Sequence, residues 1–221
     1  MQTTKQQILV LLKRAGSVTI DEAAGALAIA SMTARQHLTG LERDGLVQAE
    51  KVRRSTGRPH YLYSLTPKGD EMFPRHYELF AQLLLDEAGL LTSADIEGLD
   101  ADQKRSLLLK RTADRLAARY QFPVEGRGLE ERVSAVTDVL HLVGGFAEWL
   151  RIDGGFEIRD YNCVFARLTT EVSGCEQHTG LMTQLIKWPV QHELLLNGHV
   201  ACCRYLVYSD ARAAEGLIAN A

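Results

Sequence analysis

The residues with the most distinctive chemistry are four cysteines, which all lie within the last 60 residues: Cys163, Cys175, Cys202 and Cys203. Thiolates are soft ligands that bind iron-sulfur clusters and zinc. Structural disulfides are rare in a reducing compartment. The clustering therefore favours metal, cluster or redox chemistry over structural disulfides.

Other interpretations of the cysteines stay open at this stage. Buried free cysteines often pack as small hydrophobic side chains, and the same set suits a structural zinc site or a thiol–disulfide switch. Residues 200–208 have the composition of a strand, along which successive side chains face opposite sides. Cys202 and Cys203 therefore cannot both face one pocket in a regular strand, and one of them is the better ligand.

A second group of residues has the chemistry to read DNA. Residues 31–44 predict a helix that buries Ala34, Leu38 and Leu41 and stops at Gly45. The candidate DNA-contacting residues of this helix are Ser31, which is also expected to cap it, Thr33, Arg35, Gln36 and Thr39. Arg and Gln pair with the major-groove edges of guanine and adenine, so this composition is typical of a recognition helix.

A basic hairpin follows the candidate recognition helix. Residues 46–54 and 60–65 predict two strands, and the basic residues around their turn are Arg53, Arg54, Arg58 and His60. Side chains on such a wing contact phosphates, which supplies affinity but little sequence information. Positive charge is concentrated here, because the first 80 residues have a net charge of +3 in a chain of net charge -3.

The elements that position these residues precede them in the chain. Residues 4–14 predict a first helix that stops at Gly16, and the capping box from Thr19 to Glu22 begins a second helix. With the third helix and the hairpin, residues 1–66 therefore predict a winged helix-turn-helix domain that binds double-stranded DNA.

The sequence also resembles a known family. The motifs are Arg35-Gln36-His37-Leu38 and Gly45-Leu46-Val47 within residues 33–47, then Gly57-Arg58-Pro59 and Leu65-Thr66-Pro67-Lys68-Gly69. They resemble the ArsR/DeoR-like winged helix-turn-helix regulators, which include the SufR-type repressors of iron-sulfur assembly genes. The resemblance extends through the cysteine region, and it implies a homodimer on a palindromic operator.

The resemblance also implies a cofactor. Asn162-Cys163, Cys175, Trp188-Pro189-Val190 and residues 197–202 are similar to the cysteine region of those repressors, which sense a bound iron-sulfur cluster. By position, Cys163, Cys175 and Cys202 match the ligands of a four-iron four-sulfur cluster. Trp188 stands where cyanobacterial members have another cysteine. The resemblance therefore leaves the fourth ligand open among Cys203, His178, His192, His199, an acidic residue, and an exogenous thiol or water.

The rest of the chain predicts a helical connector and a sensor domain. Residues 67–90, with Pro74 as a candidate kink, and residues 101–120 predict two long apolar-faced helices that favour a dimer interface over a ligand site. The predicted order beyond them is helix 129–143, strands 146–152 and 156–165, helix 169–187 and a hairpin of residues 192–196 and 200–208. We therefore expect an α+β fold with domains 1–66, 67–122 and 123–221.

Composition narrows the function class. Hydrophobic residues make up 46% of the chain, which argues against disorder, and no apolar run or leader indicates a membrane span or secretion. We expect a cytoplasmic repressor whose cluster controls operator affinity. A regulator of the same architecture that senses a small ligand, zinc or thiol oxidation is the alternative. A cysteine-dependent enzyme is a remote one, since no nucleotide loop, catalytic triad or zinc-hydrolase motif is present.

Overall fold

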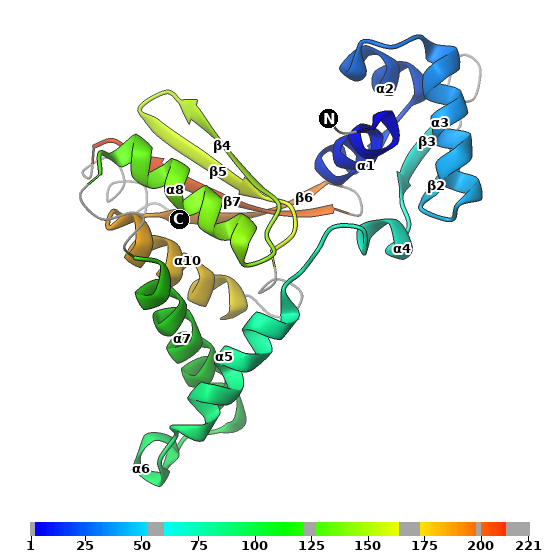
Figure 1. Cartoon of the computed structure of the whole chain (residues 1–221). Helices are drawn as coiled ribbons and strands as arrows, with labels where there is room; N and C mark the ends of the chain where they lie inside the picture. The colour runs from blue at the N-terminus through cyan, green and yellow to red at the C-terminus, as the bar shows by residue number, and fades with distance from the viewer. Residues whose placement is uncertain (1–2, 53–59, 122–126, 164–172, 198–199, 211–221) are drawn as a thin grey trace. The chain divides into compact units, whose positions relative to one another are not determined.

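The computed structural model describes residues 3–52, 60–121, 127–163, 173–197 and 200–210. The chain forms two compact units, the first mainly of Met1–Pro74 and the second mainly of Arg75–Leu195 and Cys202–Ala221. Helices and strands occur in both units (Figure 1). The predicted α+β class is therefore confirmed, with an N-terminal helix-turn-helix and a C-terminal α+β region.

The N-terminal unit consists of three helices and a small sheet. The helices are α1 (Thr4–Ala15), α2 (Ile20–Leu27) and α3 (Ser31–Arg43), and the strands are β1 (Ser17–Val18), β2 (Val47–Val52) and β3 (His60–Leu65). The sheet has the order β1-β3-β2, and β3 is antiparallel to both neighbours. Ile8, Leu12, Leu38 and Leu41 are at most 1% exposed and form the centre of this unit.

Local sequence signals explain where these helices begin and end. Thr3 and Thr19 both form capping boxes, as the sequence predicted for Thr19. Gly16 ends α1 with a φ of 80°, a conformation that glycine adopts without strain. The expected cap at Ser31 is wrong: Ala30 is the N-cap, and the Ser31 hydroxyl instead donates to Asp21 Oδ1 at 3.0 Å.

The predicted helix over residues 67–90 is broken into two. The short α4 (Pro67–Asp70) is capped by Thr66, and α5 (Tyr77–Gly89) begins only after Pro74. Proline has no amide hydrogen and disfavours the helical conformation of the residue before it, so the residues between the two helices leave helical geometry. Pro74 therefore separates two elements rather than kinking one.

The C-terminal unit packs helices on one face of a four-stranded sheet (Figure 1). Its helices are α5, α6 (Ser93–Ile96), α7 (Ala101–Tyr120), α8 (Leu129–Leu142) and α10 (Ser173–Ile186). Its strands are β4 (Ala147–Ile152), β5 (Gly155–Asp160), β6 (Gln191–Asn197) and β7 (Val200–Tyr208), in the order β4-β5-β7-β6. The strand predicted over 156–165 thus ends at Asp160, and residues 164–165 lie outside the described residues.

The core of this unit lies between the helices and the sheet. It includes Val136 and Leu140 of α8, Met182 of α10, and Ile158 and Tyr205 of the two central strands, all at most 1% exposed. Trp188 packs against the same core, as expected for a structural residue. This core also contains the candidate metal ligands.

Candidate DNA-binding surface and candidate metal centre

The third helix presents the predicted base-reading residues to solvent. Ala34, Leu38 and Leu41 are buried and fix the orientation of α3, as its periodicity predicted. The exposed residues of α3 include Ser31, Arg35, Gln36 and Thr39, whereas Thr33 is half-buried. The side chains of Arg35 and Gln36 are therefore free of the core and able to enter a major groove.

The wing is described only in part. Arg53, Arg54 and Arg58 lie outside the described residues, so their predicted phosphate contacts stay a prediction. His60 opens β3 opposite Val52 and is half-buried. The strands that carry the wing are present with antiparallel pairing from Val47–Leu65 to Val52–His60.

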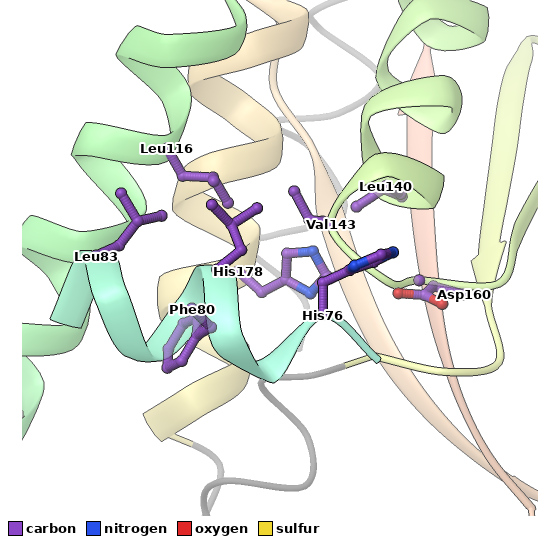
Figure 2. A pocket seen from close by; sticks show the side chains of 10 residues that line it. His76, Phe80, Leu83, Leu116, Leu140, Val143, Asp160 and His178 are labelled. Atoms are coloured by element: carbon purple, nitrogen blue, oxygen red, sulfur yellow. The ribbon is translucent and has the colours of Figure 1, made fainter. Parts of the chain in front are cut away.

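The core of the C-terminal unit contains a small pocket with two buried polar residues among its lining. It lies between α5, α7 and the end of α8, and Asp160 and His178 face it from β5 and α10 (Figure 2). Both polar residues are at most 2% exposed. Buried polar groups are costly unless they have partners, so their surroundings are informative.

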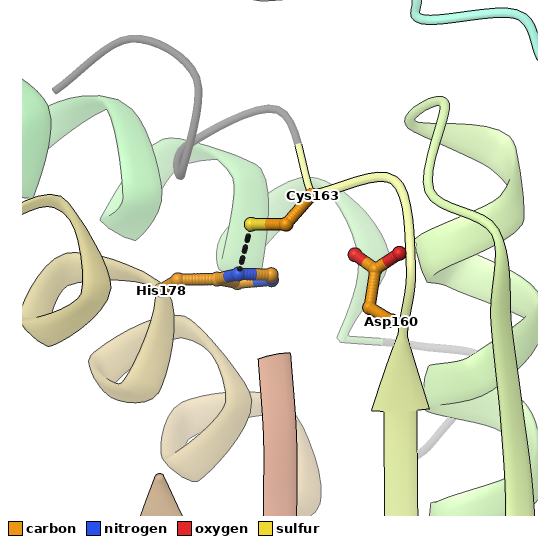
Figure 3. Close-up of side chains that lie close together, drawn as sticks. All are labelled: Asp160, Cys163 and His178. Carbon is orange, nitrogen blue, oxygen red and sulfur yellow. Dashed lines mark hydrogen bonds between the residues drawn. The ribbon is translucent and has the colours of Figure 1, made fainter. Parts of the chain in front are cut away.

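Asp160, His178 and a cysteine form a candidate ligand group. One ligand atom each of Asp160, Cys163 and His178 lies within 4.8 Å of the others, and all three residues are buried. Cys163 Sγ lies 3.0 Å from His178 Nδ1 (Figure 3), and the Tyr205 hydroxyl lies 2.6 Å from the same nitrogen. Asp160 was missed by sequence reasoning, although it lies three residues before Cys163.

A hydrogen-bonded turn holds Cys163 in this position. Asp160 Oδ1 accepts hydrogen bonds from the amides of Phe146 at 3.0 Å and Asn162 at 2.9 Å. The side-chain amide of Asn162 donates to the Gly144 carbonyl at 2.9 Å. These bonds fix the turn after β5, so Cys163 follows the strand rather than ending it as predicted.

The adjacent cysteines of β7 are placed differently. Cys203 pairs with Asp160 across the β5–β7 ladder and belongs to the core that contains Cys163. Cys202 is also buried, but strand alternation directs its side chain to the other face of the sheet. The family resemblance implies Cys202 as a ligand, whereas the structure brings Cys203 to the Cys163–His178 pair. We call Asp160, Cys163, His178 and Cys203 the cysteine–histidine site.

The electrostatics separate the two adjacent thiols. Hydrogen bonding with Cys163 lowers the pKa of Cys203 to about 5 against the opposing effect of burial, and His192 adds to the lowering. Burial raises the pKa of Cys202 to about 12. Burial lowers the pKa of His178 to about 3, so its imidazole is neutral. The site therefore combines a thiolate and a neutral imidazole, which are both good ligands for soft metals.

The other predicted ligands are less completely described. Cys175 lies in α10 three residues before His178, about one helical turn away, and only its backbone is described. The ring of His192, on β6, lies 5.1 Å from the ring of Tyr205. His199 lies outside the described residues.

The N-terminal unit defines the chain as a DNA-binding regulator of the winged helix-turn-helix class. Two capped helices, an exposed recognition helix and a β2–β3 hairpin are the parts of that domain. The family model of the DeoR-like helix-turn-helix domain matches residues 5–53, which span α1 to β2.

Comparison with whole proteins adds little to this assignment. The crystal structure of Bacillus subtilis PadR in complex with operator DNA is similar at a TM-score of 0.29 and 15% identity. That similarity covers 64% of this chain and 91% of the PadR chain. No curated protein matches the sequence. Among the described residues, no helix is both long and apolar enough to cross a bilayer.

Proposed function

We propose that this protein is a transcriptional repressor whose operator affinity is controlled by an iron-sulfur cluster in its C-terminal unit. The observation that carries the proposal is the buried cysteine–histidine site in a chain whose first unit is a helix-turn-helix domain. Buried thiols beside an imidazole have the chemistry of a ligand set rather than of ordinary packing.

The cysteine and histidine side chains of the C-terminal unit fit an iron-sulfur cluster. Cys163 and Cys203 lie together in the core with His178 beside them, and Cys175 lies on the same helix as His178, one turn earlier. We assign Cys163, Cys175 and Cys203 as the thiolate ligands, with His178 as the candidate for the fourth. When bound, an iron-sulfur cluster supplies a soft metal centre that responds to oxidants and to iron supply.

The protein's own residues prepare the site. The Asp160–Asn162 turn orients Cys163, and the hydroxyl of Tyr205 contacts the ring nitrogen of His178. Neighbours of this kind fix the orientation of first ligands in metal sites. Burial of the site excludes water, so its occupancy depends on the packing of the whole C-terminal unit.

A repressor of this class acts on paired half-sites, and the connector provides a surface for a second copy. Nine aliphatic residues of α5, α6, α7 and the turns between them are all exposed or half-buried: Leu84, Leu85, Leu90, Leu91, Ile96, Leu99, Leu107, Leu108 and Leu109. We call this group the connector surface. We propose that these side chains form an interaction surface, since large exposed apolar patches mark interaction sites.

Charge complementarity favours another copy of this chain as the occupant. Exposed Glu78 and Asp86 lie on α5, which has no basic residue, whereas exposed Lys104, Lys110 and Arg119 lie on α7. In a two-fold dimer, α5 of one protomer facing α7 of its partner would pair opposite charges around the leucines.

The dimer is tested by a charge on the connector surface. We expect Leu85→Glu to yield a monomer in sedimentation, because Leu85 is 67% exposed and the glutamate would be buried only in the dimer. The control is Leu142→Glu, at a 59% exposed leucine of α8 outside this surface, which should stay dimeric. A monomeric wild type, or an unaffected Leu85→Glu dimer, would reject this interface.

Control by the cluster is tested on DNA. A duplex is first selected from a random pool by the anaerobically purified protein, and its affinity is then measured before and after the metal is removed with a chelator. We expect metal removal to change the affinity of the wild type. Cys163→Ser should bind the duplex with the affinity of the metal-free wild type in both conditions. Equal affinity with and without metal would overturn the proposal.

A second mechanism is favoured by one contact. Because Cys203 is hydrogen-bonded to Cys163, oxidation of the two thiols is available to the protein without metal. Metal analysis separates the two mechanisms, since a thiol switch needs no iron.

A further inference from the structure

The pocket beside the cysteine–histidine site is the strongest feature that the proposed function does not use. Its volume is about 20 Å³, and its apolar lining comprises Leu79, Phe80, Leu83, Leu116, Leu140 and Val143. Asp160 and His178 are its buried polar residues, while His76, which also lines it, is exposed (Figure 2). The pocket is therefore lined both by an exposed residue and by two members of the ligand group.

We infer that this pocket is the entry site through which a small uncharged oxidant of the hydroperoxide class reaches Cys163. The inference rests on the proposed function only in taking the cysteine–histidine site as the sensor. It assigns the residues that select what the sensor reacts with.

Size and polarity define the class of ligand. A site needs roughly 10–15 Å³ of such volume to hold one water molecule, so about 20 Å³ admits only a molecule of a few atoms. The apolar walls disfavour ions, and a buried carboxylate at Asp160 further disfavours anions. Hydrogen peroxide is small and uncharged, and its hydroxyl groups are able to hydrogen-bond with Asp160 and His178.

The two cysteines of the site supply the electrons that reduce the peroxide. The Cys163 thiol passes its proton along the hydrogen bond to the Cys203 thiolate, and the Cys163 sulfur attacks one peroxide oxygen. An S–O bond forms, the O–O bond breaks, and the other oxygen leaves as hydroxide, which takes a proton from solvent to become water. The Cys203 sulfur then attacks the sulfenic sulfur of Cys163. The S–S bond forms, the S–O bond breaks, and the proton now held by Cys203 leaves with that oxygen as a second water. One thiol and one thiolate are thus oxidised to a disulfide, and one peroxide, with one proton from solvent, is reduced to two waters.

The test fills the pocket and measures thiol oxidation in the reduced, metal-free protein. Val143→Phe places a larger side chain in the wall, and Leu142→Phe adds the same ring at the neighbouring exposed residue outside the pocket. The probe is hydrogen peroxide, and thiol trapping with mass spectrometry follows Cys163 and Cys203 separately. We expect Val143→Phe to slow the oxidation of Cys163 by at least about tenfold, a barrier increase of about 1.4 kcal/mol, and Leu142→Phe to leave it unchanged.

Two further measurements test peroxide entry through the pocket even where Val143→Phe folds poorly. Leu79→Ala widens the pocket and should speed the reaction with peroxide. The bulky dianionic reagent 5,5′-dithiobis(2-nitrobenzoate) should react with the wild-type site far more slowly than with unfolded protein. Wild-type oxidation rates in folded Val143→Phe and Leu79→Ala, or rapid reaction of the dianion, would overturn the inference. Iron binding is measured separately, so failure here leaves the proposed cluster untouched.

Discussion

Replacing Arg35 by alanine should weaken DNA binding without unfolding the protein. Arg35 is exposed on α3 and does not belong to the buried stripe of Ala34, Leu38 and Leu41, so its removal leaves the core intact. Surface substitutions of this kind usually change the free energy of unfolding by less than about 0.5 kcal/mol. The loss of a bidentate contact to guanine, in contrast, costs about 1–3 kcal/mol at each half-site.

The loss of binding free energy doubles when both half-sites lose the contact from Arg35. The free energy of binding should then weaken by about 2–6 kcal/mol, which is at least a thirtyfold increase in Kd by the usual conversion of about 1.4 kcal/mol per tenfold. Fluorescence anisotropy with the selected duplex measures this change at fixed salt, because phosphate contacts make Kd depend on salt. Thermal unfolding of the same samples measures stability.

A control on the same helix separates base reading from general charge. Arg43 is exposed at the last residue of α3, and Arg43→Ala removes the same charge far from the N-terminal end that enters the groove. We expect Arg43→Ala to weaken binding to all duplexes alike and Arg35→Ala to lose discrimination between the selected duplex and a scrambled one. If both variants discriminate as the wild type does, α3 does not read bases as described.

Three further predictions concern stability. Leu38→Ala should cost about 2–5 kcal/mol of unfolding free energy in urea titrations, since Leu38 is fully buried, and a loss below 1 kcal/mol would contradict its place in the core. Burial opposes ionisation of Glu157, but hydrogen bonds from Arg204 and Arg159 outweigh it and lower the pKa of this carboxyl group. The ionised Glu157 therefore stabilises the fold above the unfolded pKa of about 4.3, and this stabilisation is lost as pH falls through the lower folded pKa. Urea titrations across this range should show a weaker pH dependence for Glu157→Gln, and an identical dependence would refute the pairing. Gly144→Ala should lower the melting temperature more than Gly154→Ala. Both glycines have positive φ, so both substitutions strain the backbone. A Cβ at Gly144 would in addition lie 2.4 Å from the backbone nitrogen of His76, whereas a Cβ at Gly154 meets nothing within 4 Å.

The N-terminal fold was predictable because its signals are local. The apolar period of α3 and the capping box at Thr19 depend on residues within one or two helical turns of each other. The cap at Ser31 was mispredicted because Asp21, ten residues earlier, takes its hydroxyl as a hydrogen-bond donor. The strand β1 was not predicted, since two residues carry no periodicity and its stability comes from pairing with β3.

The candidate metal centre was predictable only in its residue types. Strand alternation showed that Cys202 and Cys203 face opposite sides, but the choice between them requires the register that pairs Cys203 with Asp160. Asp160 itself gave no signal, because a single aspartate at a strand end is common. His178 was one of three equivalent candidates until the packing of α10 brought it to Cys163.

The central claim is tested most directly by the absorption spectrum and the iron and acid-labile sulfide content of protein purified without oxygen. The adjacent cysteines provide matched variants, since Cys203→Ser alters the cysteine–histidine site and Cys202→Ser alters the other face of the sheet. We predict broad visible absorbance with matching iron and sulfide in the wild type and in Cys202→Ser, and loss of both in Cys203→Ser. A wild type that remains colourless and iron-free after anaerobic reconstitution would contradict the account.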